Sequence, residues 1–320
     1  MKLLKLAAGI ALGLAIGTSA FAQEYPAKPI ELIVPFGPGG GTDVAARSIA
    51  IFMEKHLGKG TSIAVINTPG AGGVIGWTNL AKAKPDGYTI GMVTPPNFVA
   101  QTVAGNAKYK LDDFQLIGNI VLDPGVLVVR KDSKYQTLEE LVKASQAAKG
   151  AVVIGTSGAA GSSEHIGLLS FNRIAKASFT PAFFGDTASV RQAILGGHIP
   201  AATMNLSEIT QLIRSGDLRL LGVMSSERSP YLPDAKTFAE QGYDLVVTAS
   251  RGLAAPAGVP ADIIAKLQNA MQAAMEDPAY QEAAKKAEIP LAFLNAADYD
   301  KLLAKMEGDL VETWKVTPWR

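Results

Sequence analysis

The sequence contains no cysteine among its 320 residues, which removes several classes of chemistry at once. Thiol catalysis, cysteine-ligated zinc and iron–sulfur clusters all require a thiolate. Disulfides are also impossible, so an exported chain of this kind must be held together by its hydrophobic core. A chain of this length can bury a core large enough to do so.

The sequence also has few histidines and almost no net charge. The three histidines (His56, His165 and His198) are scattered and lack acidic partners at metal-ligand spacing, so no metal site is predicted and no cofactor is expected. The chain has 30 basic and 29 acidic residues, and 28 basic residues remain once Lys2 and Lys5 of the N-terminal segment are set aside. No basic stripe is present, which argues against nucleic acid as a partner.

The one long apolar run lies at the N-terminus and predicts a signal peptide. Lys2 and Lys5 precede the apolar run Leu6 to Ile16, and Ala20-Phe21-Ala22 fits the small-x-small cleavage rule. The run is shorter than the ~20 residues that a membrane-spanning helix needs. We therefore predict that residues 1–22 are cleaved and that the mature chain, from Gln23, is periplasmic. A retained membrane anchor is the alternative.

Short apolar, β-branched segments alternate with helical segments along the rest of the chain. This rhythm predicts an α/β protein with mainly parallel sheets flanked by helices. The length of the mature chain exceeds that of one typical domain and suggests two such domains. Strands are predicted over 30–34, 62–66, 89–93, 126–130, 151–154, 178–181, 218–223 and 245–248. Helices are predicted over 42–57, 74–83, 163–175, 189–195 and 261–275, and after the capping-box pair Thr137 and Glu140.

Two glycine-rich loops follow apolar strands and open helices, about 120 residues apart. The first amides of a helix have no partner inside it, and together with the helix dipole they form an anion site. Two such loops facing each other would hold a carboxylate at each end of a ligand, or one carboxylate and another polar group. Tight turns without a ligand are the alternative. The predicted contacts are Phe36, Gly37, Pro38, Gly39, Gly40, Gly41, Thr42 and Asp43 in the first loop, and Thr156, Ser157, Gly158 and Ser162 in the second.

Neither loop fits a nucleotide-binding motif. Thr42 stands where the dinucleotide fingerprint needs glycine, and no Gly-Lys-Ser/Thr sequence exists for a Walker loop. Asp43 would repel an anion if it pointed inward, so stabilisation of the helix end is its favoured role. A water-mediated ligand contact is the alternative for this residue.

The second loop also resembles a nucleophile elbow. Gly155-Thr156-Ser157-Gly158-Ala159 has Ala where the last Gly of Gly-x-Ser-x-Gly belongs. A serine hydrolase using Ser157 would need a histidine within reach, and His165 falls in the helix that the loop opens, which is the wrong element for the usual triad. Hydrolysis is therefore kept only as an alternative.

Four further positions are candidate contacts, each with a structural alternative. Pro95 lies in Thr94-Pro95-Pro96-Asn97 after a strand end, where ligands of α/β sheets bind, or forms a rigid turn. Phe184 is expected either to close over the ligand or to pack against the protein core. Asp186 is expected either to accept a hydrogen bond from a ligand donor or to cap the following helix. Arg251 interrupts an apolar stretch, which suits either carboxylate recognition or a structural ion pair.

Several motifs in order resemble the receptors of tripartite tricarboxylate transporters, the Bug family. They are residues 35–43, Asn67-Thr68-Pro69-Gly70-Ala71-Gly72-Gly73, Pro85-Asp86-Gly87-Tyr88-Thr89, residues 155–158 through His165, Leu195-Gly196-Gly197 and residues 252–258. The resemblance implies a type II-like periplasmic binding protein fold, with the ligand held between two domains by backbone amides and waters. It also implies delivery to a permease of one large and one small subunit.

Three positions depart from the family pattern. Thr68 stands where Arg is usual, Phe184-Gly185-Asp186 replaces a Tyr-Lys-Gly type segment, and Ser250-Arg251 stands where many relatives have Trp. The last two lie near the expected pocket and bear on the ligand's identity. Arg251 favours a second carboxylate, and Asp186 favours a hydroxyl, an amine or a proton on the ligand.

The sequence thus predicts a monomeric, non-enzymatic receptor for a small carboxylate, a di- or tricarboxylate above all. The expected domains are residues 23–123 plus 249–320, and residues 124–248. His165 and Asn205 complete the predicted ligand-binding set. A periplasmic sensor domain that presents its closed form to a signalling partner remains a further alternative.

Overall fold

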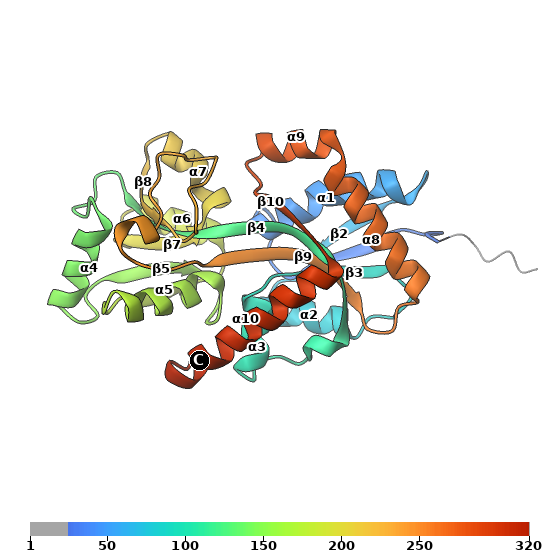
Figure 1. The fold of residues 1–320 in the computed structure, drawn as a ribbon, viewed down its shortest axis with the longest axis horizontal. Coiled ribbons are helices and arrows are strands. Elements are labelled where there is room, and N and C mark those ends of the chain that lie inside the picture. The colour runs from blue at the N-terminus through green and yellow to red at the C-terminus, as the bar shows by residue number, and fades with distance from the viewer. Residues whose placement is uncertain (1–24, 320) are drawn as a thin grey trace, which may run out of the picture.

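Two lobes share one ten-stranded sheet in the computed structural model, which describes residues 25–319 (Figure 1). The predicted signal peptide and its cleavage site lie outside the described residues. The strand order is β2-β1-β3-β9-β4-β7-β5-β6, with β8 and β10 also paired to β4. Two long strands connect the lobes: β4 (Phe114–Arg130) and β9 (Thr248–Pro256).

The first lobe is built on three parallel strands, in which β1 pairs with both neighbours: β1 (Ile30–Val34), β2 (Ile63–Asn67) and β3 (Thr89–Val93). Its edge on the other side of β4 is strand β10 (Leu291–Asn295). Its helices are α1 (Gly41–Leu57), α2 (Val74–Ala81), α3 (Asn97–Val103), α8 (Ala261–Glu276), α9 (Pro278–Lys286) and α10 (Ala296–Val316), with 3₁₀ turns at Ala71–Gly73 and Leu111–Asp113.

The second lobe repeats this plan with a smaller sheet. Strand β5 pairs in parallel with its two neighbours, while β4 contributes its second half in antiparallel orientation to β7 and β8. The strands are β5 (Val153–Ser157), β6 (Thr180–Phe184), β7 (Ala201–Asn205) and β8 (Leu218–Val223). The helices are α4 (Leu138–Ala147), α5 (Ser163–Ile174), α6 (Thr187–Leu195) and α7 (Leu206–Arg214), with a 3₁₀ turn at Ala239–Gln241.

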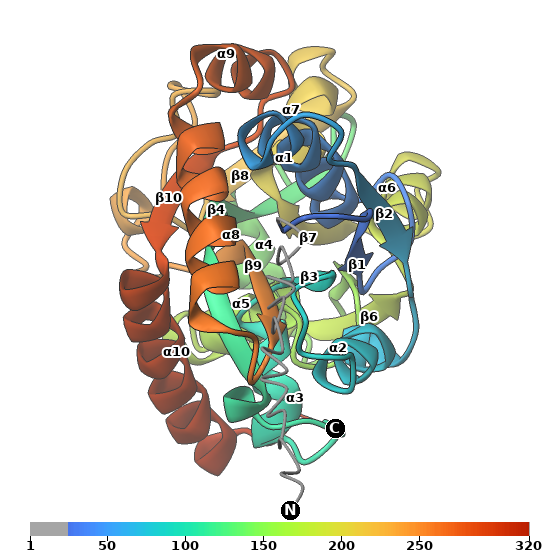
Figure 2. The same cartoon turned by 90° about the vertical axis from the view of Figure 1, so that its right-hand side faces the viewer.

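Apolar side chains on both faces of each sheet explain the layered packing. In the first lobe, α1, α8 and α9 cover one face, while α2, α3 and α10 cover the other, as Figure 2 shows. Trp77, buried on α2, contacts Phe98 of α3 edge-on, and its indole nitrogen donates to the Met92 carbonyl. The second lobe has one core on each face of its sheet, with Phe171 of α5 central to one of them.

The C-terminal helix links the lobes on one side of the molecule. Helix α10 begins on the first lobe and runs towards α5 of the second (Figure 1). The buried Trp319 that follows it packs in one cluster with Ile166 of α5 and Phe98 of α3. Two further contacts link the lobes elsewhere. Tyr231 of the second lobe donates to the Ile289 carbonyl of the first, and Arg214 of the second lobe pairs with Glu288 of the first.

The predicted α/β class is confirmed, and the sheet is mixed within it. The strands that alternate with helices are parallel, as predicted, but β4 and β9 are antiparallel to the strands beside them. The reason is that both strands cross between lobes, β4 on the way out and β9 on the way back. The strand predicted over 245–248 begins only at Thr248.

The predicted domain limits stay a proposal, supported by where the pairing of β4 changes. Pro124 pairs with Thr248 at the start of β9, and the next residue, Gly125, pairs with Asn205 of β7. This change of pairing partner supports domain limits near residues 124 and 248.

Several elements were not predicted: α3, α7, α9, α10, β7, β10 and the first half of β4. Within residues 25–319, no helix combines the length and the apolar character needed to cross a membrane.

The crossing strands pack too closely for a side chain at Gly252. An ideal Cβ there would lie 2.4 Å from Tyr299 Cε1 and 2.6 Å from the Gly118 carbonyl oxygen. Because one of these atoms is backbone, we expect Gly252→Ala to destabilise the protein by about 2 kcal/mol. Urea denaturation measures the change.

The matched control is Gly308→Ala in α10. Gly308 is exposed and its Cβ would meet nothing within 4 Å. Because alanine favours a helix interior, this variant should gain about 0.5–1 kcal/mol. Equal effects of the two substitutions would contradict the packing argument.

Candidate functional site

The two glycine loops meet in one cavity between the lobes. Its volume is about 310 Å³, at the lower end of the roughly 300–1,000 Å³ of small-molecule sites. The predicted residues that line it are Phe36, Gly37, Pro38, Gly39, Gly40, Gly41, Thr42, Ser157, Gly158, Ser162, Asp186, Asn205 and Arg251. The loops come from opposite lobes, so a ligand here would contact both.

The first loop presents the N-terminus of α1. Gly40 is the N-cap residue, with extended backbone and no capping side chain, so the first-turn amides of Gly41 and Thr42 have no side-chain acceptor. Thr94, at the end of β3, also lines the cavity, and its hydroxyl is buried without a hydrogen-bond partner among the described residues. These donors and the helix dipole suit an anion.

Asp43 is turned away from this cavity and has a structural role. Its carboxylate accepts from the Gly39 amide at 2.9 Å, from Arg47 and from the Asn67 side chain. Burial raises the pKa of Asp43, but these hydrogen bonds outweigh burial and hold the pKa below its usual value. Asp43 thus fixes the shape of the loop, and its charge is balanced by Arg47.

The second loop presents the N-terminus of α5, which Ser162 caps by accepting from the His165 amide at 3.3 Å. A carboxylate of the chain itself already lies at this helix end. Glu164 accepts from Ser157 Oγ at 2.9 Å, from Ser163 Oγ at 3.0 Å and from Asn205 Nδ2 at 2.9 Å. The hydroxyls of Ser157 and Ser163 are therefore bonded to Glu164.

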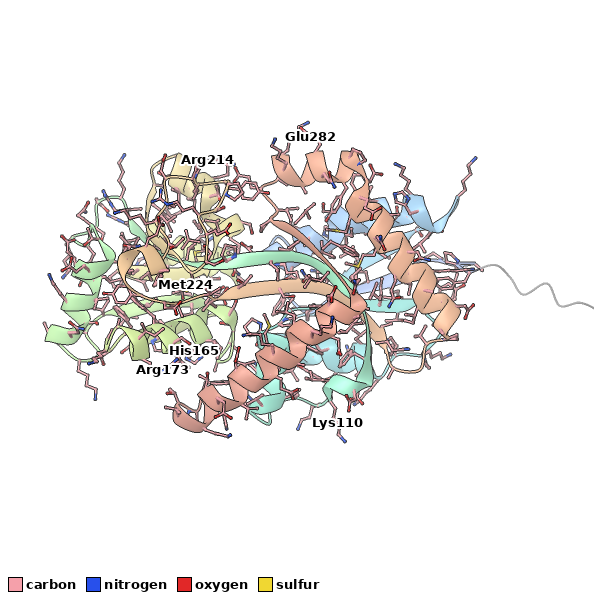
Figure 3. The ribbon with its side chains drawn as sticks, in the orientation of Figure 1. Lys110, His165, Arg173, Arg214, Met224 and Glu282 are labelled. Atoms are coloured by element: carbon pink, nitrogen blue, oxygen red, sulfur yellow. The ribbon has the colours of Figure 1, made fainter. Side chains whose placement is uncertain are left out.

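Five predicted contacts do not line the cavity. His165 is buried at the end of α5 that faces the first lobe (Figure 3), and its Nδ1 accepts from the Gly161 amide at 3.1 Å. Burial lowers the pKa of His165 to about 4, which keeps the ring neutral and able to accept. Asp43 is described above, and Pro95, Thr156 and Phe184 have backbone or packing roles.

The positions of Pro95, Thr156 and Phe184 in the fold explain their backbone and packing roles. The Pro95 carbonyl accepts from the Ser250 amide at 2.8 Å, which braces β9 against the turn. Thr156 is buried within β5, and Phe184 packs with the core beside α6 rather than over the cavity. Asp186 lines the cavity and also caps α6, because its carboxylate accepts from the Ser189 amide at 2.7 Å.

Arg251 lines the cavity as part of a buried ion-pair network. Its Nη1 lies 2.6 Å from Asp123 Oδ2, and its Nη2 lies 3.7 Å from Glu208 Oε1. An ideal Cβ on Gly41 would lie 2.5 Å from Nη2, so only glycine lets the guanidinium approach the end of α1. Arg251 therefore forms a structural ion pair and also lines the cavity. Its guanidinium adds positive potential beside the α1 amides.

Glu164, Glu208 and Arg191 line the cavity but were not predicted. Glu164 was visible in the loop as Ser-Ser-Glu-His. Glu208 belongs to a capping pattern, Asn205-x-x-Glu208. The same pattern indicates the start of helix α7, which was not predicted. Arg191 carried no sequence signal, because its position depends on how α6 packs.

Ser157 and His165 do not form the hydrogen-bonded pair that serine hydrolysis would need. Ser157 is bonded to Glu164, and His165 is bonded to the Gly161 amide instead of to Ser157. Across residues 25–319, no cluster of three His, Cys, Asp or Glu side chains could hold a metal ion.

Two α/β lobes joined by crossing strands, with a ligand-sized cavity between them, define a bilobal solute-binding protein. The chain belongs to the tripartite tricarboxylate transporter family receptors, whose family model matches residues 45–314. The family resemblance of the sequence motifs is thereby confirmed.

Known relatives agree over nearly the full length. Protein BugT of Bordetella pertussis is 33% identical over 290 residues, covering 88% of each chain. The structure of the periplasmic binding protein BugD is 29% identical with a TM-score of 0.80, covering 91% of this chain and 98% of that one. MatC from Rhodopseudomonas palustris, solved with bound malate, is 27% identical with a TM-score of 0.80, covering 90% and 99%.

The buried carboxyl of Glu208 gives the site a measurable effect on stability. Burial raises its pKa to about 7, Arg251 opposes the rise, and Glu164 and Asp123 add to it. The native state thus binds more protons than the unfolded state between about pH 4.5 and 7. The contribution of Glu208 to the stability of the wild type should therefore fall as the pH rises through this window.

Glu208→Gln removes this titration and keeps an acceptor for the Asn205 amide. Relative to wild type, the variant should gain on the order of 2 kcal/mol in free energy of unfolding between pH 5 and pH 8. Chemical denaturation at both pH values measures the gain. Glu282→Gln, on the exposed surface of α9 (Figure 3), controls for the loss of one charge and should show no such change. A relative loss of stability at pH 8 would refute the assignment.

Proposed function

We propose that this chain is a periplasmic receptor that captures a small carboxylate between its lobes and delivers it to a two-subunit membrane permease. The observation that carries the proposal is the meeting of two helix N-termini, one from each lobe, in a single cavity. Capture needs no bond-breaking machinery, which agrees with the engaged states of Ser157 and His165.

The end of α1 is where the ligand carboxylate binds in this proposal. A carboxylate that leaves water must regain its hydrogen bonds, and each charge-assisted bond contributes about 1.5–3 kcal/mol. The amides of Gly41 and Thr42 and the Thr94 hydroxyl supply donors at this end. Arg251 adds positive charge from the side.

Closure of the lobes follows from the position of the ligand. A molecule that contacts both loops binds the closed arrangement more tightly than the open one, so it shifts the population towards the closed form. The crossing strands β4 and β9 are the only strands shared by the lobes within the described chain, and they provide the hinge. The closed surface is then what a permease would recognise.

The narrower prediction of a di- or tricarboxylate stays a prediction. The malate bound to the MatC relative supports a small organic acid as the ligand class. The prediction of a second carboxylate depended on Arg251, whose Nη1 is already paired with Asp123. A monomeric state and a periplasmic location are part of the same proposal. The periplasmic binding protein BugD supports the location, and the cavity formed by two lobes of one chain supports the monomer.

Gly40→Val tests the proposed anion end. Gly40 has a φ of −80°, which valine adopts readily, and its Cβ would meet only the Gly37 oxygen at 3.9 Å. The variant should fold normally and place a side chain beside the free amides. In a thermal-shift and calorimetric screen of small mono-, di- and tricarboxylates, affinity should fall by about a hundredfold, or ~2.7 kcal/mol.

Gly308→Ala, remote from the cavity, is the matched control and should bind like the wild type. A wild-type protein that binds none of these carboxylates would refute the proposed function. Unchanged affinity in Gly40→Val would instead relocate the carboxylate away from α1.

A further inference from the structure

The two ends of the cavity differ in charge. At the α1 end, the first-turn carboxylate of Asp43 points away from the cavity and is paired with Arg47 at 3.0 Å. At the α5 end, the first-turn carboxylate of Glu164 lines the cavity, and its hydrogen-bond donors are neutral groups. No ion pair to Glu164 is formed by residues 25–319, and Arg251, the guanidinium that interacts with it at longer range, is already paired with Asp123.

An acceptor without a partner lies beside Glu164. The Asn205 amide nitrogen donates to Glu164 Oε1 at 2.9 Å, which directs the amide oxygen elsewhere. That oxygen is buried at the N-cap of α7, where it faces the Glu208 amide without meeting the geometry of a full hydrogen bond, and Asn205 itself lines the cavity and is only 5% exposed. A buried acceptor left unpaired is costly, so a donor on a ligand would relieve that cost.

The surrounding charges reinforce this asymmetry. The charged side chains lining the cavity are Glu164, Asp186, Glu208, Arg191 and Arg251, and Arg251 is already paired with Asp123 outside the cavity. Four carboxylates thus accompany two guanidinium groups. Burial is the main cause that raises the pKa of Glu208 to about 7, Arg251 opposes the rise, and the neighbouring carboxylates Glu164 and Asp123 add to it.

A second anionic group on the ligand would therefore meet repulsion at the α5 end. A positively charged donor would instead be attracted to the Glu164 carboxylate and would satisfy the Asn205 oxygen. The α1 end, with its free amides and adjacent Arg251, favours the opposite sign.

We propose that the cavity is built for a small zwitterionic amino-carboxylate, with its carboxylate at the α1 end and its ammonium group on Glu164 and Asn205. This inference rests on the proposed carboxylate-binding function, and it replaces the second carboxylate predicted from the sequence with an ammonium group. Glu164 and Asn205 are then the residues that determine specificity against dicarboxylates.

Four probes with one carbon skeleton test the class by calorimetry at neutral pH: butanoate, 2-aminobutanoate, 4-aminobutanoate and succinate. They differ in the absence, position or replacement of the second charged group. At least one of the two amino acids should bind about tenfold or more tightly than both butanoate and succinate. The position of the ammonium in the tighter isomer reports the spacing between the two ends.

Glu164→Gln separates charge from shape. Glutamine retains an oxygen for the Ser157 and Asn205 donors, so the fold should persist. The variant should lose about tenfold or more in affinity for the preferred amino acid, while butanoate affinity changes little. Glu282→Gln, exposed on α9, controls for net charge and should bind all four probes like the wild type.

Two outcomes would overturn the inference while the proposed function stands. One is tighter binding of succinate than of either amino acid by the wild type. The other is an equal ratio of amino acid to butanoate affinity in wild type and Glu164→Gln. Failure of the wild type to bind these four probes or any acid of the wider carboxylate screen would overturn both proposals.

Discussion

The buried ion pair between Arg251 and Asp123 is the contact on which the centre of the molecule depends. The two residues lie on the crossing strands β9 and β4, and both side chains are almost completely shielded from water. Asp123 also accepts from the amide and hydroxyl of Ser207 at the start of α7. The pair therefore ties both connecting strands to the second lobe, and removal of one partner would leave a buried charge uncompensated.

The same pair determines the electrostatics of the cavity. A free arginine here would make the whole cavity attractive to anions. Because Asp123 takes one side of the guanidinium, Arg251 offers only limited positive charge, directed to Gly41 at the end of α1. Glu164 at the α5 end then has no cation in direct contact among the described residues. Two loops with similar backbone roles thus become unlike in charge, and this difference, rather than the glycines, discriminates between ligands.

The fold places these features opposite each other through repetition of one device. Each lobe has a parallel three-strand unit whose glycine loop follows a strand and opens a helix, at residues 36–43 in one and 157–163 in the other. Antiparallel β4 and β9 bring the carboxyl ends of the two units to a shared cavity. Backbone amides from both loops can therefore hold a ligand, while side chains such as Glu164 and Arg251 set the charge of the cavity.

The sequence by itself determined the local elements and the two loops. Strand β1, strand β3, strand β8 and the capping box of Thr137 with Glu140 depend on neighbouring residues, so pattern and capping chemistry suffice to predict them. The tertiary structure alone decided the directions of side chains. Whether Ser157 faces a ligand or Glu164, whether His165 lines the cavity or holds the Gly161 amide, and which carboxylate neutralises Arg251 all depend on residues distant in the chain. Such contacts arise only when the two lobes and their crossing strands pack, because burial and pairing are properties of neighbours in space.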